Sequence, residues 1–407
     1  MTASAGLRRQ EATYWQKRLA PFGLSSRHTL GAGRFSFQER RVTRSIDIGL
    51  LFSTSGPYRL MGQASREGAL KAIEQVNDDV EIDMVFCPVE RDPGGDIDAY
   101  APLCEDILKN SSARHVIGCT TSWSRKEVIP SLERLGGVLW YPTPYEGFES
   151  SDRVVYAHAC PNQHLLPLLE HAFAAYGSRS YLTGSNYIWG WEMNRIAREV
   201  SAKRGAHVLG ERYVPIGSTD IARLVDEIAA LKPDFVLNQL IGPSQYAFLE
   251  AMAQLRADDP AFGDNACPVL SCNMTEAELG AMGAAAEGVI AAGPWFKGMA
   301  PALPGNEGRF DFGSSFEAAA HASVMMLARL LSSVPDAEAL SLPELLAMPR
   351  AASVGISPRT HHVALPVAIA AVRNGKFVPI ETHAPIEGDP YLTQSTQRPQ
   401  PMLRVVR

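Results

Sequence analysis

Residues 46–56, IDIGLLFSTSG, join a short apolar run to a small, polar turn. The run at 46–52 has the length and apolarity of a buried strand, and residues 65–77 then have amphipathic helical spacing. Residues 84–89 and the segment that ends near Leu108 repeat this order of strand, loop and helix. Regular alternation of this kind predicts a parallel sheet with helices on both of its faces.

The alternation continues along most of the chain and then gives way to an antiparallel end. In the first half we expect strands at 115–119 and 137–140, with a helix at 125–135 between them. After a helix at 162–176, strands at 180–183, 207–214 and 235–240 are each followed by a helix, at 191–203, at 219–231 and up to Leu255. The last expected elements are strands at 269–271 and 288–292, a helix at 316–331 and a hairpin at 372–377. The predicted class is α/β, with two doubly wound parallel-sheet lobes and an interlobe cleft.

The same pattern divides the chain into four parts. We expect an amino-terminal arm at 1–45, lobe 1 at 46–158 plus about 290–350, lobe 2 at 159–289 plus about 351–390, and a tail at 391–407. The arm has only weak helical periodicity, so it is either a partly ordered segment packed on the body or a docking element.

Composition excludes several classes of partner. The chain has 407 residues, of which 46% are hydrophobic, enough for two cores, and its formal net charge is -6. It has no extended cluster of Lys and Arg, which argues against direct binding to nucleic acid or to an anionic membrane. No secretory signal and no apolar run of membrane-spanning length is visible, so we expect a cytoplasmic protein.

The search for catalytic and metal-binding motifs is negative. The sequence has no Gly-x-Ser-x-Gly elbow, no His-Glu-x-x-His and no phosphate-binding loop. Cys119 with His115 or His158 is a possible thiol nucleophile and base, but its apolar surroundings argue against it. His361 and His362 have no further ligand at metal spacing. We therefore expect no enzyme, no cofactor and no metal, and six cysteines that stay free.

The loops that follow the predicted strands carry hydroxyls and aromatic rings but few charges. In parallel sheets, ligands bind beyond the carboxyl ends of the strands. Hydroxyls such as Ser122 and Thr143 and rings such as Tyr141, Tyr187 and Trp189 suit a small, neutral, polar ligand. A charged ligand would require a buried counter-charge.

Structural alternatives exist for two of these residues. Tyr141 stands at a strand end and could equally belong to the core. Ser122 precedes a predicted helix, so capping is its simplest role, although a cap can also contact a ligand. In the loop YPTPYEGFE, residues 141–149, two prolines fix the backbone and thereby pre-set Thr143.

This loop, together with the segments IGLLFS at 48–53, DPGGD at 92–96 and DPY at 389–391, is similar to sequences of the type I periplasmic-binding-protein superfamily. The resemblance is strongest to the branch that holds the cytoplasmic amide sensor and negative regulator of the aliphatic amidase operon and the urea and short-chain amide transporter binding proteins. It runs from Ile46 to about Tyr391. The resemblance implies that the ligand is held between the lobes by Ser122, Tyr141, Thr143, Pro144, Tyr187 and Trp189, with Ile241 on the apolar side.

Two departures from the amide sensor bear on the ligand. Thr120 and Trp189 stand where the sensor has tyrosines, so the pocket loses one ring and gains an indole, and the preferred amide can differ. The Thr143-Pro144 pair favours the sensor, because the urea-binding branch is expected to have Val-Gln there. We expect residues 145–149 to lock the loop instead of contacting the ligand.

The resulting hypothesis is a cytoplasmic binding protein that senses a small neutral amide and regulates an amidase or nitrile-hydratase operon. It would act through a protein partner, such as an antiterminator or another transcriptional regulator. The alternative is the solute-binding receptor of a urea or short-chain amide ABC transporter. The oligomeric state is left open, with a homo-oligomer possible.

Overall fold

The computed structural model of the chain describes residues 44–149, 151–263, 266–300, 303–308, 311–332, 336–393 and 401–404. The expected arm at 1–45 therefore lies outside the described residues, except for its last two positions, which already belong to the first strand. The described residues form two sheets with helices packed on both faces of each. The predicted fold class is confirmed.

The first sheet is entirely parallel and has the strand order β2-β1-β3-β4-β5. Its strands are β1 (Arg44–Leu51), β2 (Met84–Arg91), β3 (His115–Gly118), β4 (Val138–Tyr141) and β5 (Val154–Tyr156). Four of these were expected within a few residues, whereas β5 was not. This strand has only three residues, too few for its periodicity to be visible in the sequence.

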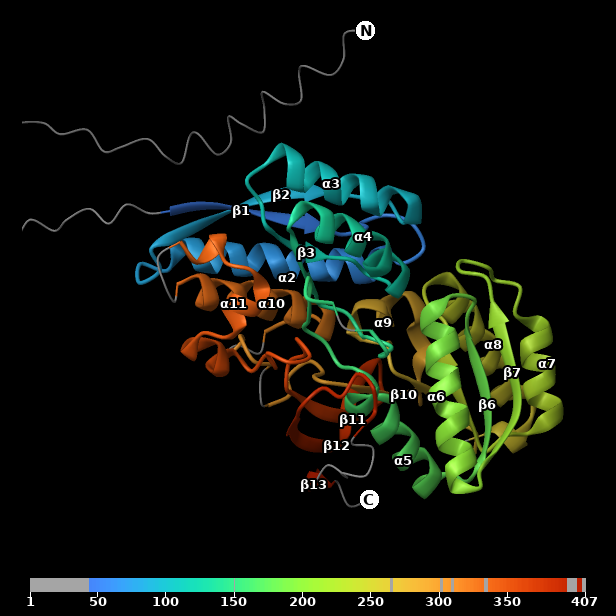
Figure 1. Ribbon diagram of the computed structural model, residues 1–407. Coiled ribbons are helices and arrows are strands. Elements are labelled where there is room, and N and C mark those ends of the chain that lie inside the picture. The colour runs from blue at the N-terminus through green and yellow to red at the C-terminus, as the bar shows by residue number, and fades with distance from the viewer. Residues whose placement is uncertain are drawn as a thin grey trace, which may run out of the picture. The chain divides into compact units, whose positions relative to one another are not determined.

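Two pairs of helices cover this sheet and complete lobe 1. The helices α3 (Tyr100–Asn110) and α4 (Ser122–Leu135) pack on one face. The helices α2 (Arg59–Asp78) and α10 (Ser315–Leu331) lie side by side on the other (Figure 1). The long helix α10 is buried along nearly its whole length, because it packs along α2, on the sheet and against the 3₁₀ turn Pro349–Val354.

The second sheet has the order β13-β12-β11-β10-β9-β8-β6-β7 among the described residues, and its last three strands in chain order are antiparallel. Its strands are β6 (Arg179–Ser185), β7 (His207–Val214), β8 (Phe235–Gln239), β9 (Val269–Ser271), β10 (Ile290–Gly293), β11 (Leu365–Arg373), β12 (Lys376–Ile386) and β13 (Pro401–Arg404). The expected antiparallel end is confirmed.

The structure adds detail at two of the expected boundaries. The return to lobe 1 was expected at about 290, and β10 pairs with β9 and β11, so the chain leaves lobe 2 after Gly293. Within the expected tail at 391–407, β13 pairs with the edge strand β12. Backbone hydrogen bonds can recruit a proline-flanked edge segment that shows no strand pattern of its own.

Helices cover both faces of the second sheet as well. Successive residues of β6 point to opposite faces: Leu182 packs with α5 (Leu165–Ala175) and α6 (Ile188–Arg204), whereas Tyr181 faces α7 (Ala222–Leu231) and α8 (Pro243–Asp258). Shorter elements are α9 (Glu276–Met282), α11 (Leu342–Leu346) and 3₁₀ turns at Ile97–Ala99, Pro161–Gln163, Pro260–Phe262, Gly283–Ala286, Ala337–Ala339 and Pro349–Val354.

The described chain crosses between the lobes after β5, after β10 and before β11. The first and last crossings are tied together, because the Tyr156 amide donates to the His361 carbonyl at 2.9 Å and the Val363 amide donates to the Tyr156 carbonyl at 3.2 Å. The His362 ring also stacks on Tyr156, with 4.3 Å between ring centroids. These two crossings therefore move as one unit.

None of the described helices is both long and apolar enough to cross a bilayer. All six cysteines are free, as expected, and all but the half-buried Cys87 are buried.

Candidate ligand-binding site

A small pocket lies where the carboxyl ends of strands from both sheets meet. Lobe 1 contributes the loops after β3 and β4 together with α2 and α10, and lobe 2 contributes the loops after β6, β8 and β9. The lining residues are Met61, Thr120, Thr121, Ser122, Tyr141, Pro144, Tyr187, Trp189, Ile241, Asn273 and Phe316. The space open to the centres of water molecules is about 20 Å³, roughly enough for one or two waters.

Seven of the eight residues singled out in the sequence line this pocket, namely Thr120, Ser122, Tyr141, Pro144, Tyr187, Trp189 and Ile241. Thr143 is buried beside them but is not part of the lining. That these side chains hold a ligand remains a prediction. Asn273 was missed although it follows a strand, β9, and the same rule about strand ends would have identified it.

The turn between β3 and α4 aims Thr120 and Ser122 at the pocket. Cys119 has a φ of 67°, a conformation that is rare for a residue with a side chain, and its amide donates to the Leu51 carbonyl at 2.9 Å. Its thiol is fully buried, and burial raises the pKa of Cys119 well above its usual range. A thiol held neutral in this way is a poor nucleophile, which disfavours the catalytic alternative.

The cap of α4 is Thr121, not Ser122 as expected. The Thr121 hydroxyl accepts from the Ser124 amide at 3.2 Å, and the Ser124 hydroxyl accepts from the Thr121 amide at 3.0 Å. This reciprocal capping box leaves the Ser122 hydroxyl free for another partner.

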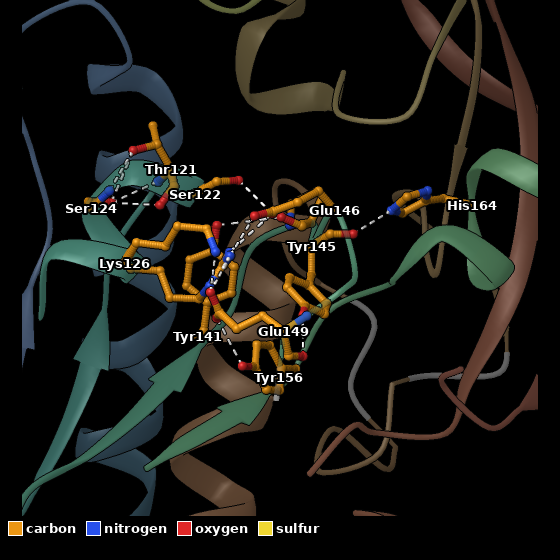
Figure 2. Close-up of polar contacts among 12 residues, drawn as sticks. Thr121, Ser122, Ser124, Lys126, Tyr141, Tyr145, Glu146, Glu149, Tyr156 and His164 are labelled. Carbon is orange, nitrogen blue, oxygen red and sulfur yellow. Dashed lines mark hydrogen bonds and ion pairs between the residues drawn. The ribbon is translucent and has the colours of Figure 1, made fainter. Parts of the chain in front are cut away.

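That partner is Glu146 of the loop after β4 (Figure 2). The Ser122 hydroxyl donates to a carboxylate oxygen of Glu146 at 2.6 Å, and both side chains are buried. A hydroxyl has one hydrogen, and an ionised carboxylate can only accept. Ser122 therefore offers the pocket a lone pair and no donor.

The carboxylate of Glu146 forms an ion pair with a buried guanidinium. Arg125 donates to Glu146 at 2.6 Å and to Glu149 at 2.8 Å, and Lys126 pairs with Glu149 as well. The Arg125 guanidinium also lies over the rings of Tyr141 and Tyr145, at 4.9 and 4.7 Å from their centroids. Two cations thus balance two anions directly behind the pocket wall.

The pKa of Glu149 follows from this balance. Burial alone would raise it, but the ion pairs and hydrogen bonds with Arg125 and Lys126 outweigh burial and lower the pKa of Glu149 to about 2. Burial likewise opposes the charge on Arg125, and the two carboxylates outweigh it and raise the pKa of Arg125.

The second half of the loop after β4 is fixed by contacts outside the pocket. The Tyr145 amide donates to the Ala159 carbonyl at 3.0 Å, and its carbonyl is 3.2 Å from Nε2 of His164. Gly147 has a φ of 87° and lies so close to the Pro390 carbonyl that an added Cβ would be 2.7 Å from its oxygen. These contacts agree with the expectation that residues 145–149 lock the loop.

In lobe 2, short contacts between strand ends set the opposite wall. The Ile241 amide donates to the Ser185 hydroxyl at 3.1 Å, and the Asn273 side chain donates to the Leu240 carbonyl at 3.1 Å. Gly190 lets α6 begin close to β6, since a Cβ there would lie 2.3 Å from the Ser185 carbonyl oxygen. Trp189 is thereby brought to the pocket at the start of α6.

Polar atoms without a partner in the protein occur on both walls. Trp189 Nε1 and Thr120 Oγ1 are buried and make no hydrogen bond, and the same holds for Thr143 Oγ1 behind the lining. A buried polar group without a partner costs roughly 1–3 kcal/mol. The lining itself, all of it from described residues, carries no carboxylate, ammonium or guanidinium. The arrangement thus suits an uncharged guest with hydrogen-bonding groups.

Comparison with known proteins identifies the family. A family model for a periplasmic binding protein domain matches residues 46–397. A solute-binding protein of an ABC transporter from R. palustris, in complex with 4-hydroxybenzoate, is 17% identical with a TM-score of 0.71, over 86% of this chain and 100% of that one.

Two further solved structures share the fold. A branched-chain amino acid transporter substrate-binding protein from Streptococcus pneumoniae, in complex with isoleucine, is 15% identical with a TM-score of 0.67, over 84% and 100% of the two chains. A periplasmic binding protein from Burkholderia mallei is 16% identical with a TM-score of 0.70, over 85% and 96%. At such identities the likeness establishes the type I fold, and the family match extends over most of the chain. The chain is therefore a ligand-binding protein of the periplasmic binding protein family.

Proposed function

We propose that the protein binds a small neutral amide or a urea-like molecule in the pocket between its lobes. The observation that carries this proposal is the polarity of two lining side chains. Ser122 can only accept a hydrogen bond, because its hydrogen is given to Glu146, whereas Trp189 Nε1 can only donate and has no partner. An amide group supplies the N–H and the carbonyl oxygen that these two side chains require.

Charge argues for a neutral ligand. Arg125 is the buried cation behind the pocket, and its donors are already directed at Glu146 and Glu149. An anionic ligand would thus enter without a free counter-charge and would lie near the carboxylate of Glu146, at a large desolvation cost. The similar structures that hold 4-hydroxybenzoate or isoleucine are therefore a guide to the fold and not to the ligand.

Size argues for a ligand of few atoms. A space of about 20 Å³ for water centres fits one or two waters, so a molecule such as urea or acetamide requires little widening. A benzoate ring would require Tyr187, Trp189 or Phe316 to move. Rings that are packed this closely also exclude water, which strengthens each hydrogen bond to the ligand.

Two biological roles are compatible with such binding. The solved structures of similar fold include solute-binding proteins of ABC transporters, which favours a receptor for a urea or short-chain amide transporter. The Thr143-Pro144 pair favours the other role, a cytoplasmic amide sensor that controls an amidase or nitrile-hydratase operon through a partner regulator. In both roles the ligand acts by favouring one arrangement of the lobes.

Calorimetry with the purified full chain tests the ligand. We expect acetamide, butyramide or urea to bind and acetate, which has the shape of acetamide but carries a charge, to bind at least roughly tenfold more weakly. Binding of acetate as tight as that of acetamide, or no heat from any amide with folded protein, would contradict the proposal.

Deletion of the gene in its native host separates the two roles. A transport receptor predicts lost uptake of labelled amide and recovery of the protein outside the cytoplasm. A sensor predicts altered amidase expression with unchanged uptake and recovery from the cytoplasm.

A further inference from the structure

Large apolar side chains are exposed along one stripe of the surface beside the pocket. The described residues contain seven strongly exposed large hydrophobic side chains, and four of them, Trp123, Phe148, Trp191 and Tyr391, belong to this stripe. They are between 37% and 47% exposed. Four aromatic rings gathered in one place indicate an interaction site, whereas scattered single hydrophobics require no explanation.

A chain of contacts shows that the stripe is continuous. Trp123 of α4 packs on Tyr187, with 5.6 Å between ring centroids, and the Trp191 amide donates to the Tyr187 carbonyl at 3.1 Å. One turn further along α6, Arg195 lies over the ring of Phe148 at 4.4 Å from its centroid. Phe148 in turn meets Tyr391 edge to face at 6.3 Å.

The stripe takes its residues from both lobes. Trp123 and Phe148 belong to lobe 1, Trp191 and Arg195 to lobe 2, and Tyr391 to the segment after β12. Tyr187, on which Trp123 packs, is buried beneath the stripe and lines the pocket. Neither lobe alone therefore presents the complete surface.

The composition of the stripe matches the core of a protein interface. Trp, Tyr, Phe and Arg are the residue types that are enriched in such cores and among the side chains that dominate binding energy. From their exposed fractions, the four rings present roughly 300–400 Å² of surface. A standard interface covers about 800 Å² on each partner, so the stripe can supply its central half.

The charges on the stripe favour one particular occupant. Arg195 is already paired with Glu192 at 2.9 Å and with Glu199 at 2.6 Å on the same helix. The aromatic face thus carries both signs of charge side by side, which is the pattern that a patch needs to meet its own copy across a two-fold axis. In such a dimer, Arg195 of one copy can pair with Glu199 of the other copy in place of its own Glu199. The same exchange in the second copy leaves no charge unpaired.

We propose that the aromatic stripe of Trp123, Trp191, Phe148 and Tyr391 is the interface at which two copies of this chain form a symmetric dimer. None of these four exposed rings lines the pocket, and the proposal does not depend on the identity of the ligand. Dimerisation across it would bury the four exposed rings and couple the lobes of one copy to those of the other.

Sedimentation velocity of the full chain over micromolar to submillimolar concentrations tests the proposal. We expect a monomer–dimer equilibrium that the Trp191→Ser variant weakens by roughly tenfold or more. The matched control is Leu231→Ser, which removes a similarly exposed side chain at the end of α7 and should leave the equilibrium unchanged. Tyr391→Ser, near the end of the described chain, provides a second variant that cannot disturb the core.

Thermal unfolding of each variant, followed by circular dichroism, confirms that the chain is folded. A wild-type protein that stays monomeric at the highest concentration overturns the proposal. A dimer that neither Trp191→Ser nor Tyr391→Ser weakens would also overturn it, because the copies would then meet through another surface.

Discussion

The two walls of the pocket handle buried polarity in opposite ways. In lobe 1, Ser122, Glu146 and Arg125 form a charged network in which each partner is engaged. In lobe 2, the lining donor Trp189 Nε1 is buried without a hydrogen-bond partner. The hydroxyls of Thr120 and Thr143 in lobe 1 also have none. The contrast therefore concerns charge: the lobe 1 wall is backed by paired ions, whereas the lobe 2 wall presents an unpaired neutral donor.

This difference shows how a two-lobed binding protein can divide its tasks. A satisfied network of charges fixes the position and polarity of the lobe 1 wall before any ligand arrives. Unpaired groups in lobe 2 gain most when the ligand is present, since a buried polar atom without a partner is costly. Ligand binding should therefore favour approach of lobe 2 to a wall that is already shaped.

The variant with the largest expected effect removes Arg125, the buried cation of the lobe 1 network. Arg125→Met leaves Glu146 buried without a counter-charge and Glu149 with Lys126 alone, and we expect it to lower the free energy of unfolding by about 3–5 kcal/mol. Thermal unfolding followed by circular dichroism measures the change, since urea is itself a proposed ligand. The control is Arg134→Met at the exposed end of the same helix, where a surface ion pair with Glu105 contributes about 0–1 kcal/mol. Equal losses in both variants would contradict a special role for the buried network.

Stability as a function of pH should distinguish two buried carboxyls, Glu149 of lobe 1 and Glu278 of lobe 2, by sign. In lobe 1 the pKa of Glu149 is lowered from 4.5 to about 2, so its contribution is present above pH 4.5 and is lost as the pH falls towards 2. In lobe 2 the fully buried Glu278 has its pKa raised by burial from 4.5 to about 7, against hydrogen bonds from Tyr246 and Gln245. Its neutral form is favoured in the folded state, so stability falls as the pH rises from 4.5 through 7.

Each of these shifts corresponds to at most about 3 kcal/mol. Glu149→Gln should reduce the loss of stability between pH 4.5 and 2 and leave the change between pH 4.5 and 7 as it is. Glu278→Gln should reduce the change between pH 4.5 and 7 and leave the loss at lower pH as it is. Unfolding temperatures measured across the two pH windows provide the test. The assignment fails if both variants change stability in the same pH window.

The third test reverses the polarity of Ser122. In Glu146→Gln, the amide oxygen faces the guanidinium of Arg125, so the amide nitrogen is left to donate to Ser122. The Ser122 hydrogen is then free to point into the pocket. We expect the affinity ratio of acetamide to acetone, which lacks an N–H, to fall roughly tenfold in calorimetry. Glu127→Gln, exposed on the same helix, is the control, and an unchanged ratio would refute the role assigned to Ser122.

Most of the fold could be predicted from the sequence because its units are regular. The strands expected at 207–214 and 269–271 coincide with β7 and β9, and residues at strand ends, such as Thr120 and Ile241, converge on one pocket. The direction of a parallel strand fixes where its carboxyl end lies, so this convergence follows from topology alone.

The rest depended on contacts that no local pattern reveals. Ser122 was expected to cap α4, but Thr121 is the cap because Ser124 completes the capping box with it. Ser122 is therefore free to bond Glu146, 24 residues further along the chain. The sequence marked Glu146 only as a residue of a locked loop. That it sets the polarity of a pocket side chain appears only when α4 and the loop after β4 are placed side by side.

The smallest test removes the unpaired indole donor from the lobe 2 wall. Trp189→Phe keeps an aromatic ring in the pocket but deletes Nε1, the donor that we assign to the carbonyl oxygen of the ligand. A neutral hydrogen bond contributes about 0.5–1.5 kcal/mol, so acetamide should bind roughly three- to tenfold more weakly. Trp191→Phe deletes an indole donor on the same helix that bonds the exposed Asn186 side chain, and acetamide binding should not change. If the two variants bind acetamide equally well, the lobe 2 wall recognises the ligand by shape alone and the contrast between the walls does not extend to ligand binding.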